Sequence, residues 1–453
     1  MPTIGSAALS APAQFLSRID SRTGKIGVIG LGYVGLPLVL LFSQQKFAIT
    51  GFDIDTRKVE TLSRGGSYIA RIEPAHVQAA RDHGFTPTTD FSRLAEMDAV
   101  IICVPTPLDE FRQPDMSYII KTAEAIAPYI HPGQLIVLES TTYPGTTEEV
   151  LVPILEKGNR SGLKAARKDQ SDGAVFYVAF SPEREDPGRT DIERHDIPKV
   201  VGGLNPAATE LAVAVYGTIF RRPVPVSTPA VAEMTKLLEN IYRCVNVAMV
   251  NELKLLCLRM GVDIWEVIEA AKTKPFGFQA FYPGPGLGGH CIPVDPYYLS
   301  WKAKEYDFQA RFIELAGDIN TAMPYHVVAA VSAALNREKK SLNGSKILVL
   351  GVAYKKDVDD LRESPSLIII ELLQRESSVV SYNDPYVPVI GRGRKYNFDL
   401  RSTPLDNLSQ YDCLLIVTDH SGYDYARIVR ESNLVVDTRN ATRGLDAPNI
   451  VRC

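Results

Sequence analysis

The chain has 453 residues, which is long for a single core and predicts two or three domains. Its 49 basic and 53 acidic side chains leave a formal net charge of -4, so it has no general positive field for nucleic acid or anionic lipid. Its six cysteines form no C-x-x-C pair and no dense framework, so we expect neither disulfides nor structural zinc, and no other metal.

The start of the chain, residues 1–23, is mixed and polar, without the charged and apolar regions of a secretory signal. No later window offers about 18 uncharged apolar residues for a membrane span. We therefore expect a short disordered tail on a soluble cytoplasmic protein, with no membrane insertion and no nucleic-acid partner.

A dinucleotide fingerprint comes after the tail. The apolar run K-I-G-V-I at residues 25–29 predicts a buried parallel strand, and G-L-G-Y-V-G comes directly after it and leads into an apolar helical stretch. The first glycine permits a tight turn, the second lets a pyrophosphate approach, and the third allows close helix packing. The residues expected to contact the cofactor here are Gly30, Gly32, Tyr33, Val34 and Gly35.

An acid ends the next predicted strand. Residues 47–52 lead to Asp53, about 20 residues beyond the glycines, where a carboxylate accepts hydrogen bonds from the adenosine ribose. This acid favours NAD over NADP. Arg57 just after it is also expected to contact the cofactor, and with Lys58 it leaves tolerance of a 2′-phosphate open. Strand, glycines, helix and acid together predict an NAD site.

Polar residues come after three further predicted strands. The runs ending at residues 104 and 138 lead to Thr106 and Thr141, and residues 176–180 lead to Glu183 and Arg184. Ligands of open parallel sheets lie beyond the carboxyl ends of the strands, so these side chains are placed to meet cofactor or substrate. For each threonine, a role as a turn former is an equal alternative.

A long helical pattern runs from about residue 231 to residue 260. Lys236 and Asn240 are four residues apart on this helix and therefore share a face. A polar helix face exposed to solvent is the alternative explanation for this pair. Beyond the helix, a Gly/Pro-rich loop precedes Cys291, with Asp295 four residues later. Such a loop is typical of a presented nucleophile, because glycines admit a ligand and a reactive thiol needs access. A structural turn with an inert cysteine is the alternative.

From residue 346 the chain returns to alternating strands and helices. The full glycine fingerprint is missing, since G-V-A-Y at 351–354 replaces it, so no second dinucleotide is expected. Lys355, Lys356 and Arg362 are candidates for a nucleotide diphosphate, with a solvated basic loop as the other explanation. The predicted fold class is α/β, with two Rossmann-like doubly wound parallel-sheet domains joined by a long central helix and a helical middle domain.

Together these motifs resemble the UDP-glucose/GDP-mannose dehydrogenase family, the NAD-dependent nucleotide-sugar 6-dehydrogenases. The matching pieces, besides the first glycine loop and the cysteine loop, are V-P-T-P at 104–107, S-T at 140–141, S-P-E-R at 181–184, E-M-T-K-L-L-E-N at 233–240, K-K-D at 355–357, R-E-S at 362–364 and D-T-R at 437–439. The cysteine loop, with His290 where the UDP-glucose and GDP-mannose branches usually have Ser, resembles the branch acting on UDP-N-acetylglucosamine and related N-acetylhexosamines.

The resemblance implies that the C6 alcohol of a nucleotide sugar is oxidised to a carboxylate by two NAD molecules. It makes Cys291 the nucleophile that captures the aldehyde as a thiohemiacetal and then carries a thioester. Lys236 and Asn240 would stabilise the oxyanion, and Asp295 would orient Lys236. Glu183 and Thr141 would position water, although a shift of one residue would exchange Thr141 for Thr142.

The resemblance also implies the remaining contacts. Arg362 would reach the NAD phosphates, Lys355 the substrate diphosphate, and Arg184 the polar groups of the sugar. The other residues implied to bind the UDP-sugar, alongside Lys236 and Asn240, are Tyr282, Gly284, Gly286, Gly288 and Arg439. The implied domains are 24–225 for NAD, a central helical domain 226–335 carrying the cysteine loop, and 336–453 for the UDP-sugar.

The leading hypothesis is a UDP-N-acetylglucosamine 6-dehydrogenase that serves surface polysaccharide or lipopolysaccharide synthesis as a homodimer or larger homo-oligomer. The same chemistry on UDP-N-acetylmannosamine or UDP-glucose stays open. A second class is a two-electron NAD-dependent dehydrogenase of related architecture, in which Cys291 is incidental. A third is a nucleotide-sensing protein without turnover.

Overall fold

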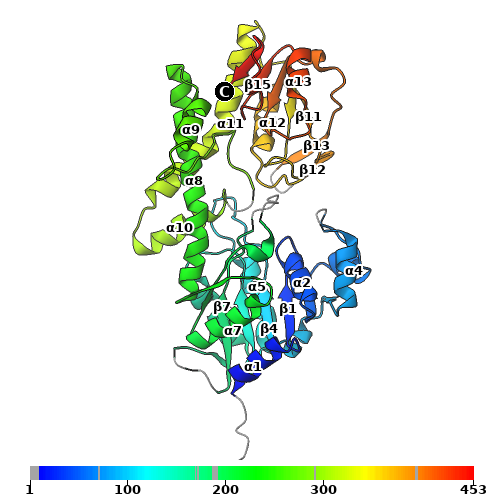
Figure 1. The fold of residues 1–453 in the computed structure, drawn as a ribbon, viewed down its shortest axis with the longest axis vertical. Helices are drawn as coiled ribbons and strands as arrows, with labels where there is room; N and C mark the ends of the chain where they lie inside the picture. The colour runs from blue at the N-terminus through cyan, green and yellow to red at the C-terminus, as the bar shows by residue number, and fades with distance from the viewer. Residues whose placement is uncertain are drawn as a thin grey trace, which may run out of the picture. The chain divides into compact units, whose positions relative to one another are not determined.

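The computed structural model describes residues 10–69, 72–168, 170, 173–185, 192–289, 292–392 and 396–453. The chain divides into two compact units, residues 1–238 and 239–453. Both units are built of mainly parallel strands alternating with helices, so the predicted α/β class is confirmed (Figure 1). Among the described residues, no helix is long and apolar enough to cross a bilayer.

The first unit contains a nine-stranded sheet of order β3-β2-β1-β4-β5-β7-β8-β9, with β6 paired to β7. All pairs are parallel except β7 with β8. The strand order reverses between β1 and β4, which is where doubly wound sheets bind ligands. The strands are β1 Lys25–Ile29, β2 Ala48–Phe52, β3 Thr86–Thr88, β4 Ala99–Ile102, β5 Leu135–Leu138, β6 Lys164–Ala165, β7 Val175–Phe180, β8 Lys199–Gly203 and β9 Pro223–Val226.

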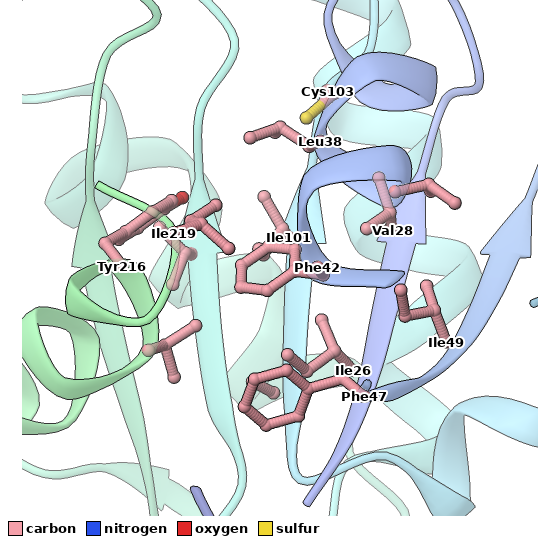
Figure 2. Close-up of a cluster of buried hydrophobic side chains, with 14 of the residues drawn as sticks. Ile26, Val28, Leu38, Phe42, Phe47, Ile49, Ile101, Cys103, Tyr216 and Ile219 are labelled. Carbon is pink, nitrogen blue, oxygen red and sulfur yellow. The ribbon is translucent and has the colours of Figure 1, made fainter. Parts of the chain in front are cut away.

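Helices cover both faces of this sheet. One apolar cluster joins strand residues such as Ile26 and Ile101 to Phe42 of α2 and Tyr216 of α7 (Figure 2). A second cluster joins the alternate strand residues to α5 and α6. Strands buried on both faces explain the continuous apolar runs in the sequence. The helices are α1 Ala11–Asp20, α2 Gly35–Gln44, α3 Thr56–Ser63, α4 Pro74–Asp82, α5 Ser117–Ile126, α6 Val152–Gly158 and α7 Pro206–Gly217.

The expected disordered tail through residue 23 is wrong for residues 11–20, which form α1. The Ser10 side chain caps the helix by accepting a hydrogen bond from the Ala13 amide. Phe15 and Ile19, four residues apart, are fully buried in the first apolar cluster. A ten-residue segment with three large apolar side chains, Phe15, Leu16 and Ile19, gives little periodicity, so burial against the sheet decides its structure.

The second unit contains a five-stranded parallel sheet of order β11-β10-β14-β15-β16 and a separate antiparallel pair. The strands are β10 Lys346–Leu350, β11 Val379–Asn383, β12 Val389–Arg392, β13 Asn397–Arg401, β14 Cys413–Ile416, β15 Val435–Asp437 and β16 Ile450–Arg452. The helices are α9 Ile264–Lys272, α10 Asp295–Ala303, α11 Arg311–Arg337, α12 Pro365–Arg375 and α13 Tyr425–Glu431.

The predicted long helix is α8, Pro229–Met260, with 32 residues. The division between the two compact units falls inside it, after Leu238. The domain limits expected at residues 225 and 335 stay predictions.

Candidate active site

The glycines after β1 are constrained in two different ways. Gly30 has a φ of 89°, and a Cβ there would lie 2.5 Å from the Cys103 carbonyl oxygen. A Cβ on Gly35 would lie 2.0 Å from the Gly30 carbonyl oxygen, whereas one on Gly32 would meet nothing within 4 Å. Packing therefore requires Gly30 and Gly35, while Gly32 leaves open backbone beside the start of α2. This arrangement fits a dinucleotide pyrophosphate.

Asp53 is buried and supports this turn. Its Oδ2 accepts hydrogen bonds from the Leu31 amide at 2.9 Å and from Lys58 Nζ at 3.2 Å. Arg57 instead pairs with Asp55, its Nη2 at 3.1 Å from Oδ2, with 89% of its side chain exposed. Tyr33 is exposed and Val34 precedes the first residue of α2. Asp53 thus holds the glycine turn.

The strand ends beyond β4 and β5 carry the predicted threonines. Thr106 is buried, Thr141 is half-buried, and the buried Thr142 shares a hydrogen bond of 2.5 Å with Thr146. Glu233 of α8 accepts hydrogen bonds from the Gly145 and Thr147 amides at 2.6 and 2.9 Å. Burial raises the pKa of Glu233 to about 7, against the hydrogen bonds that lower it. The start of α8 thus anchors the segment after Thr141.

The structure brings Glu183 and Lys236 together. Lys236 Nζ donates to the Glu183 carbonyl oxygen at 2.8 Å. The Glu183 carboxylate accepts from the amides of Arg184 and Glu185 at 2.8 and 2.7 Å, and its side chain is 13% exposed. Burial alone would raise the pKa of Glu183, but Lys199, Arg194 and Lys236 hold it below its usual range. Glu183 is therefore an ionised carboxylate beside a cation.

Asn240 and Asp295 meet in the second unit. Asn240 Nδ2 donates to Asp295 Oδ2, and Arg243 Nη2 donates to Asn240 Oδ1. Both Asn240 and Asp295 are buried, on α8 and at the first residue of α10. This contact was not predicted, because the resemblance gave Asp295 the role of orienting Lys236.

The glycine loop before the cysteine is held on both sides. The Gly284 amide donates to Asn251 Oδ1 at 2.9 Å, and a Cβ on Gly284 would lie 2.6 Å from Arg439 Nη1. Arg439 Nε donates to the Val417 carbonyl oxygen at 2.9 Å. Arg439, which the resemblance implies as a substrate contact, therefore lies directly against the predicted sugar loop.

The far end of the same loop lies against the segment after β10. The Gly289 amide donates to the Arg362 carbonyl oxygen at 2.9 Å, and a Cβ on Gly288 would lie 2.6 Å from Tyr354 Cβ. Lys355 lies in that segment and is half-buried. Arg362 Nη2 forms an ion pair with Asp360 at 2.6 Å. The structure thus gathers the predicted sugar and diphosphate residues of the second unit.

Tyr282 opens the loop and is anchored by α9. Its hydroxyl donates to Glu269 Oε1 at 2.7 Å, and its ring stacks on Trp265 with centroids 5.9 Å apart. Gly286, with a φ of 138°, continues the loop beside Pro365. The predicted nucleophile Cys291 and its neighbour His290 lie outside the described residues.

Comparison with known proteins agrees with this geometry. The family models of the UDP-glucose/GDP-mannose dehydrogenase family match residues 24–220 as the NAD binding domain, 230–322 as the central domain and 348–444 as the UDP binding domain. The chain belongs to this family. It is an NAD-dependent nucleotide-sugar dehydrogenase, and the predicted cofactor is confirmed.

Relatives cover almost the whole of this nucleotide-sugar dehydrogenase. It is 35% identical over 438 residues to an NDP-N-acetyl-D-galactosaminuronic acid dehydrogenase of Ralstonia nicotianae, covering 93% of this chain and 96% of the relative. It is 34% identical over 400 residues to a UDP-N-acetyl-D-glucosamine 6-dehydrogenase of Pseudomonas aeruginosa, covering 88% and 91%. The solved UDP-D-ManNAc dehydrogenase of Pyrococcus horikoshii superposes with a TM-score of 0.83 at 31% identity, covering 94% of this chain and 98% of its own.

Sequence reasoning missed several buried polar residues of the dehydrogenase. Glu139 comes directly after the predicted strand that leads to Thr141, and Lys199 opens β8, yet neither received a role. Asn251 and Asn320, which hydrogen-bond to each other at 2.9 Å, support Gly284 from within helices. The strand-end rule would have found Glu139, whereas the other three carry no local signal.

Proposed function

We propose that the enzyme oxidises the C6 hydroxyl of a UDP-N-acetylhexosamine to the uronic acid, with UDP-N-acetylglucosamine as the preferred substrate. The product would serve surface polysaccharide synthesis. The observation that carries the substrate class is that the three relatives are named for N-acetylated sugars of three different configurations. The choice of UDP-N-acetylglucosamine rests on the resemblance of the cysteine loop to that of the branch acting on this sugar and related N-acetylhexosamines. NAD, when bound, accepts the hydride that leaves C6 in each of two oxidations.

In the proposed mechanism, the alcohol proton leaves to water held by Glu183 and Thr141 as C6 becomes an aldehyde. The Cys291 thiolate then adds to the aldehyde carbon, and a proton completes the thiohemiacetal. A second oxidation gives the thioester, and water hydrolyses it to release the carboxylate and the thiol. The ionised state of Glu183 supports its role as the base for this water.

Lys236 and Asn240 stabilise the negative oxygen in this proposal. A cation and an amide donor aimed at a developing oxyanion lower the barrier, because little reorganisation is needed in a water-poor site. Lys236 is held by the Glu183 carbonyl oxygen, and Asn240 by Asp295 and Arg243. The side chains are thus ordered before substrate binds. Lys355 and Arg439 are proposed to hold the diphosphate and sugar against the glycine loop.

The experiment that tests this proposal is a count of NADH at completion with limiting UDP-N-acetylglucosamine. Two NADH per sugar are expected, with little from UDP-N-acetylmannosamine or UDP-glucose run in parallel. One NADH per sugar would instead support a two-electron dehydrogenase. Two NADH from another sugar alone would retain the chemistry and overturn the choice of substrate.

Cys291→Ser isolates the covalent step. We expect loss of uronic acid formation with UDP-sugar binding retained, because a serine hydroxyl is far less nucleophilic than a thiolate. Calorimetric titration with the UDP-sugar checks binding, and Cys257→Ser, which makes the same change at a half-buried thiol of α8, serves as the matched control. Full activity in Cys291→Ser would rule out the covalent mechanism.

We also propose a homodimer or larger homo-oligomer. Met249, Leu253, Leu256 and Met260 recur at helical spacing on α8 and are 41% to 64% exposed. An unbroken apolar stripe of this kind favours burial against another chain. Light scattering at working concentration should give at least twice the mass of the chain, and a monomer would remove the proposal.

The domain limits 24–225, 226–335 and 336–453 are likewise proposed as NAD-binding, central and UDP-sugar-binding. The three matched family segments lie within these limits, which supports them. Cytoplasmic location is proposed from the thiols, since the described cysteines are all free.

A further inference from the structure

A buried charged cluster connects β5, β8 and α7 in the first unit. Lys199 Nζ contacts Glu139 Oε1, and the two side chains are 2% and 0% exposed. Tyr216 donates a hydrogen bond of 2.7 Å to Glu139 Oε2. Lys199 Nζ also lies 3.9 Å from Glu183 Oε2. One buried ammonium group therefore serves two carboxylates.

The two carboxylates are treated differently by their surroundings. Glu183 accepts two backbone amides and faces Arg194 and Lys236 in addition to Lys199. Glu139 has Tyr216 and the shared lysine but is more deeply buried, and the neutral thiol of Cys103 lies near both. Burial raises the pKa of Glu139, while the cations hold that of Glu183 down. Two carboxyl groups whose surroundings move their pKa values in opposite directions are suited to different roles.

We propose that Lys199 is a positioning residue for the reaction, whose buried ammonium keeps the Glu183 carboxylate ionised so that it accepts the proton from water. Glu139 is the counter-ion that lets a lysine be buried at the start of β8. This inference rests on the proposed function, because it presumes that Glu183 is the base. A plain ion pair tying β5 to β8 is the alternative, and it makes no demand on the state of Glu183.

The test compares the pH dependence of kcat in Glu139→Gln and in the double variant Lys199→Met/Glu139→Gln. Removing Lys199 alone would leave Glu139 buried without its partner, whereas the double variant removes both charges. Loss of a cation about 4 Å away should move the acid limb of kcat to higher pH by about one unit or more. Glu139→Gln keeps the ammonium with Glu183 as its remaining carboxylate partner, so its acid limb should stay near that of the native enzyme or move to lower pH.

Controls separate this inference from the function it rests on. Lys199→Arg retains the charge and should retain the native acid limb. Glu183→Gln should abolish turnover; if it does not, or if the native enzyme yields no NADH from any UDP-sugar, the proposed function fails. If Glu183→Gln is inactive but the double variant and Glu139→Gln share one acid limb, only the role of Lys199 is overturned.

Folding is checked by thermal unfolding of every variant. If the Met/Gln pair does not fold, the Gln/Gln pair Lys199→Gln/Glu139→Gln replaces it with neutral groups that can hydrogen-bond to each other. Failure of both neutral pairs to fold would make Lys199 a structural requirement of the sheet and would overturn the catalytic inference.

Discussion

The first crossovers of the two sheets begin alike and then diverge. Gly30 after β1 and Gly351 after β10 have φ values of 89° and 78°. A Cβ on either would lie within 2.5 Å of a carbonyl oxygen on the neighbouring strand end. In the first unit α2 starts at Gly35, whereas in the second α12 starts only at Pro365. The turn is shared, but the segment between the turn and the helix is longer in the second crossover.

The acids after the second strands differ in the same way. Asp53 accepts hydrogen bonds from the Leu31 amide and from Lys58, next to the open backbone at Gly32. Asp384 accepts the Val352 and Ala353 amides at 2.7 and 3.0 Å and also pairs with buried His420 at 2.9 Å. Its carboxylate is occupied by the protein itself. This occupancy of Asp384 is consistent with the missing dinucleotide fingerprint of the second crossover.

The largest effect is expected from the packed glycines of the first crossover. Gly35→Ala should prevent stable folding or NAD binding altogether, because its Cβ would lie 2.0 Å from a backbone oxygen. Gly32→Ala should fold normally, since nothing lies within 4 Å, yet weaken NAD binding. Thermal unfolding and fluorescence titration with NAD distinguish the two. Equal stability of both variants would contradict the division between packing and ligand glycines.

Asp384→Asn should be the next most damaging, with a loss of about 3 kcal/mol or more in the free energy of unfolding, because the NH2 group of asparagine replaces one carboxylate oxygen and leaves the buried donors on that side without an acceptor. Burial alone would raise the pKa of Asp384, but hydrogen bonds from His420 and the loop amides hold it below the usual range. The stabilisation is therefore present at neutral pH and lost as pH falls. Urea unfolding across a pH series should show the gap between native and variant closing in acid.

Glu233→Gln changes how stability depends on pH in the first unit. The folded-state pKa of about 7 exceeds the ordinary 4.5, so the carboxyl group stabilises the fold most below 4.5 and that stability is lost as pH rises through 7. The difference corresponds to about 3 kcal/mol. Glu233→Gln should remove this slope, and identical slopes in urea unfolding would show that the segment after Thr141 is not anchored by a neutral carboxyl.

Arg57→Ala should have the smallest effect. Its guanidinium pairs with Asp55 at the surface, and exposed pairs contribute little. We expect an unchanged melting temperature and at most a slight weakening of NAD binding in calorimetry. A large loss of NAD affinity would contradict this prediction and indicate that Arg57 contacts the cofactor directly.

Much of the fold was predictable because its signals are local. Strand, glycines and acid lie within residues 25–53, and a close backbone approach admits only glycine at two of the positions. The apolar runs of strands buried on both faces marked the two sheets. The tail was misjudged because α1 depends on burial of Phe15 and Ile19 against distant residues.

The sequence by itself determined the family, the α/β class and the NAD cofactor, because their signals are local runs and glycine spacings. Only the tertiary structure decided that Lys199 is shared by Glu139 and Glu183, that Asn251 and Arg439 flank Gly284, and that Asp384 is occupied by its own loop. These contacts join residues far apart in the chain. Their strength comes from shared burial, which no local pattern encodes.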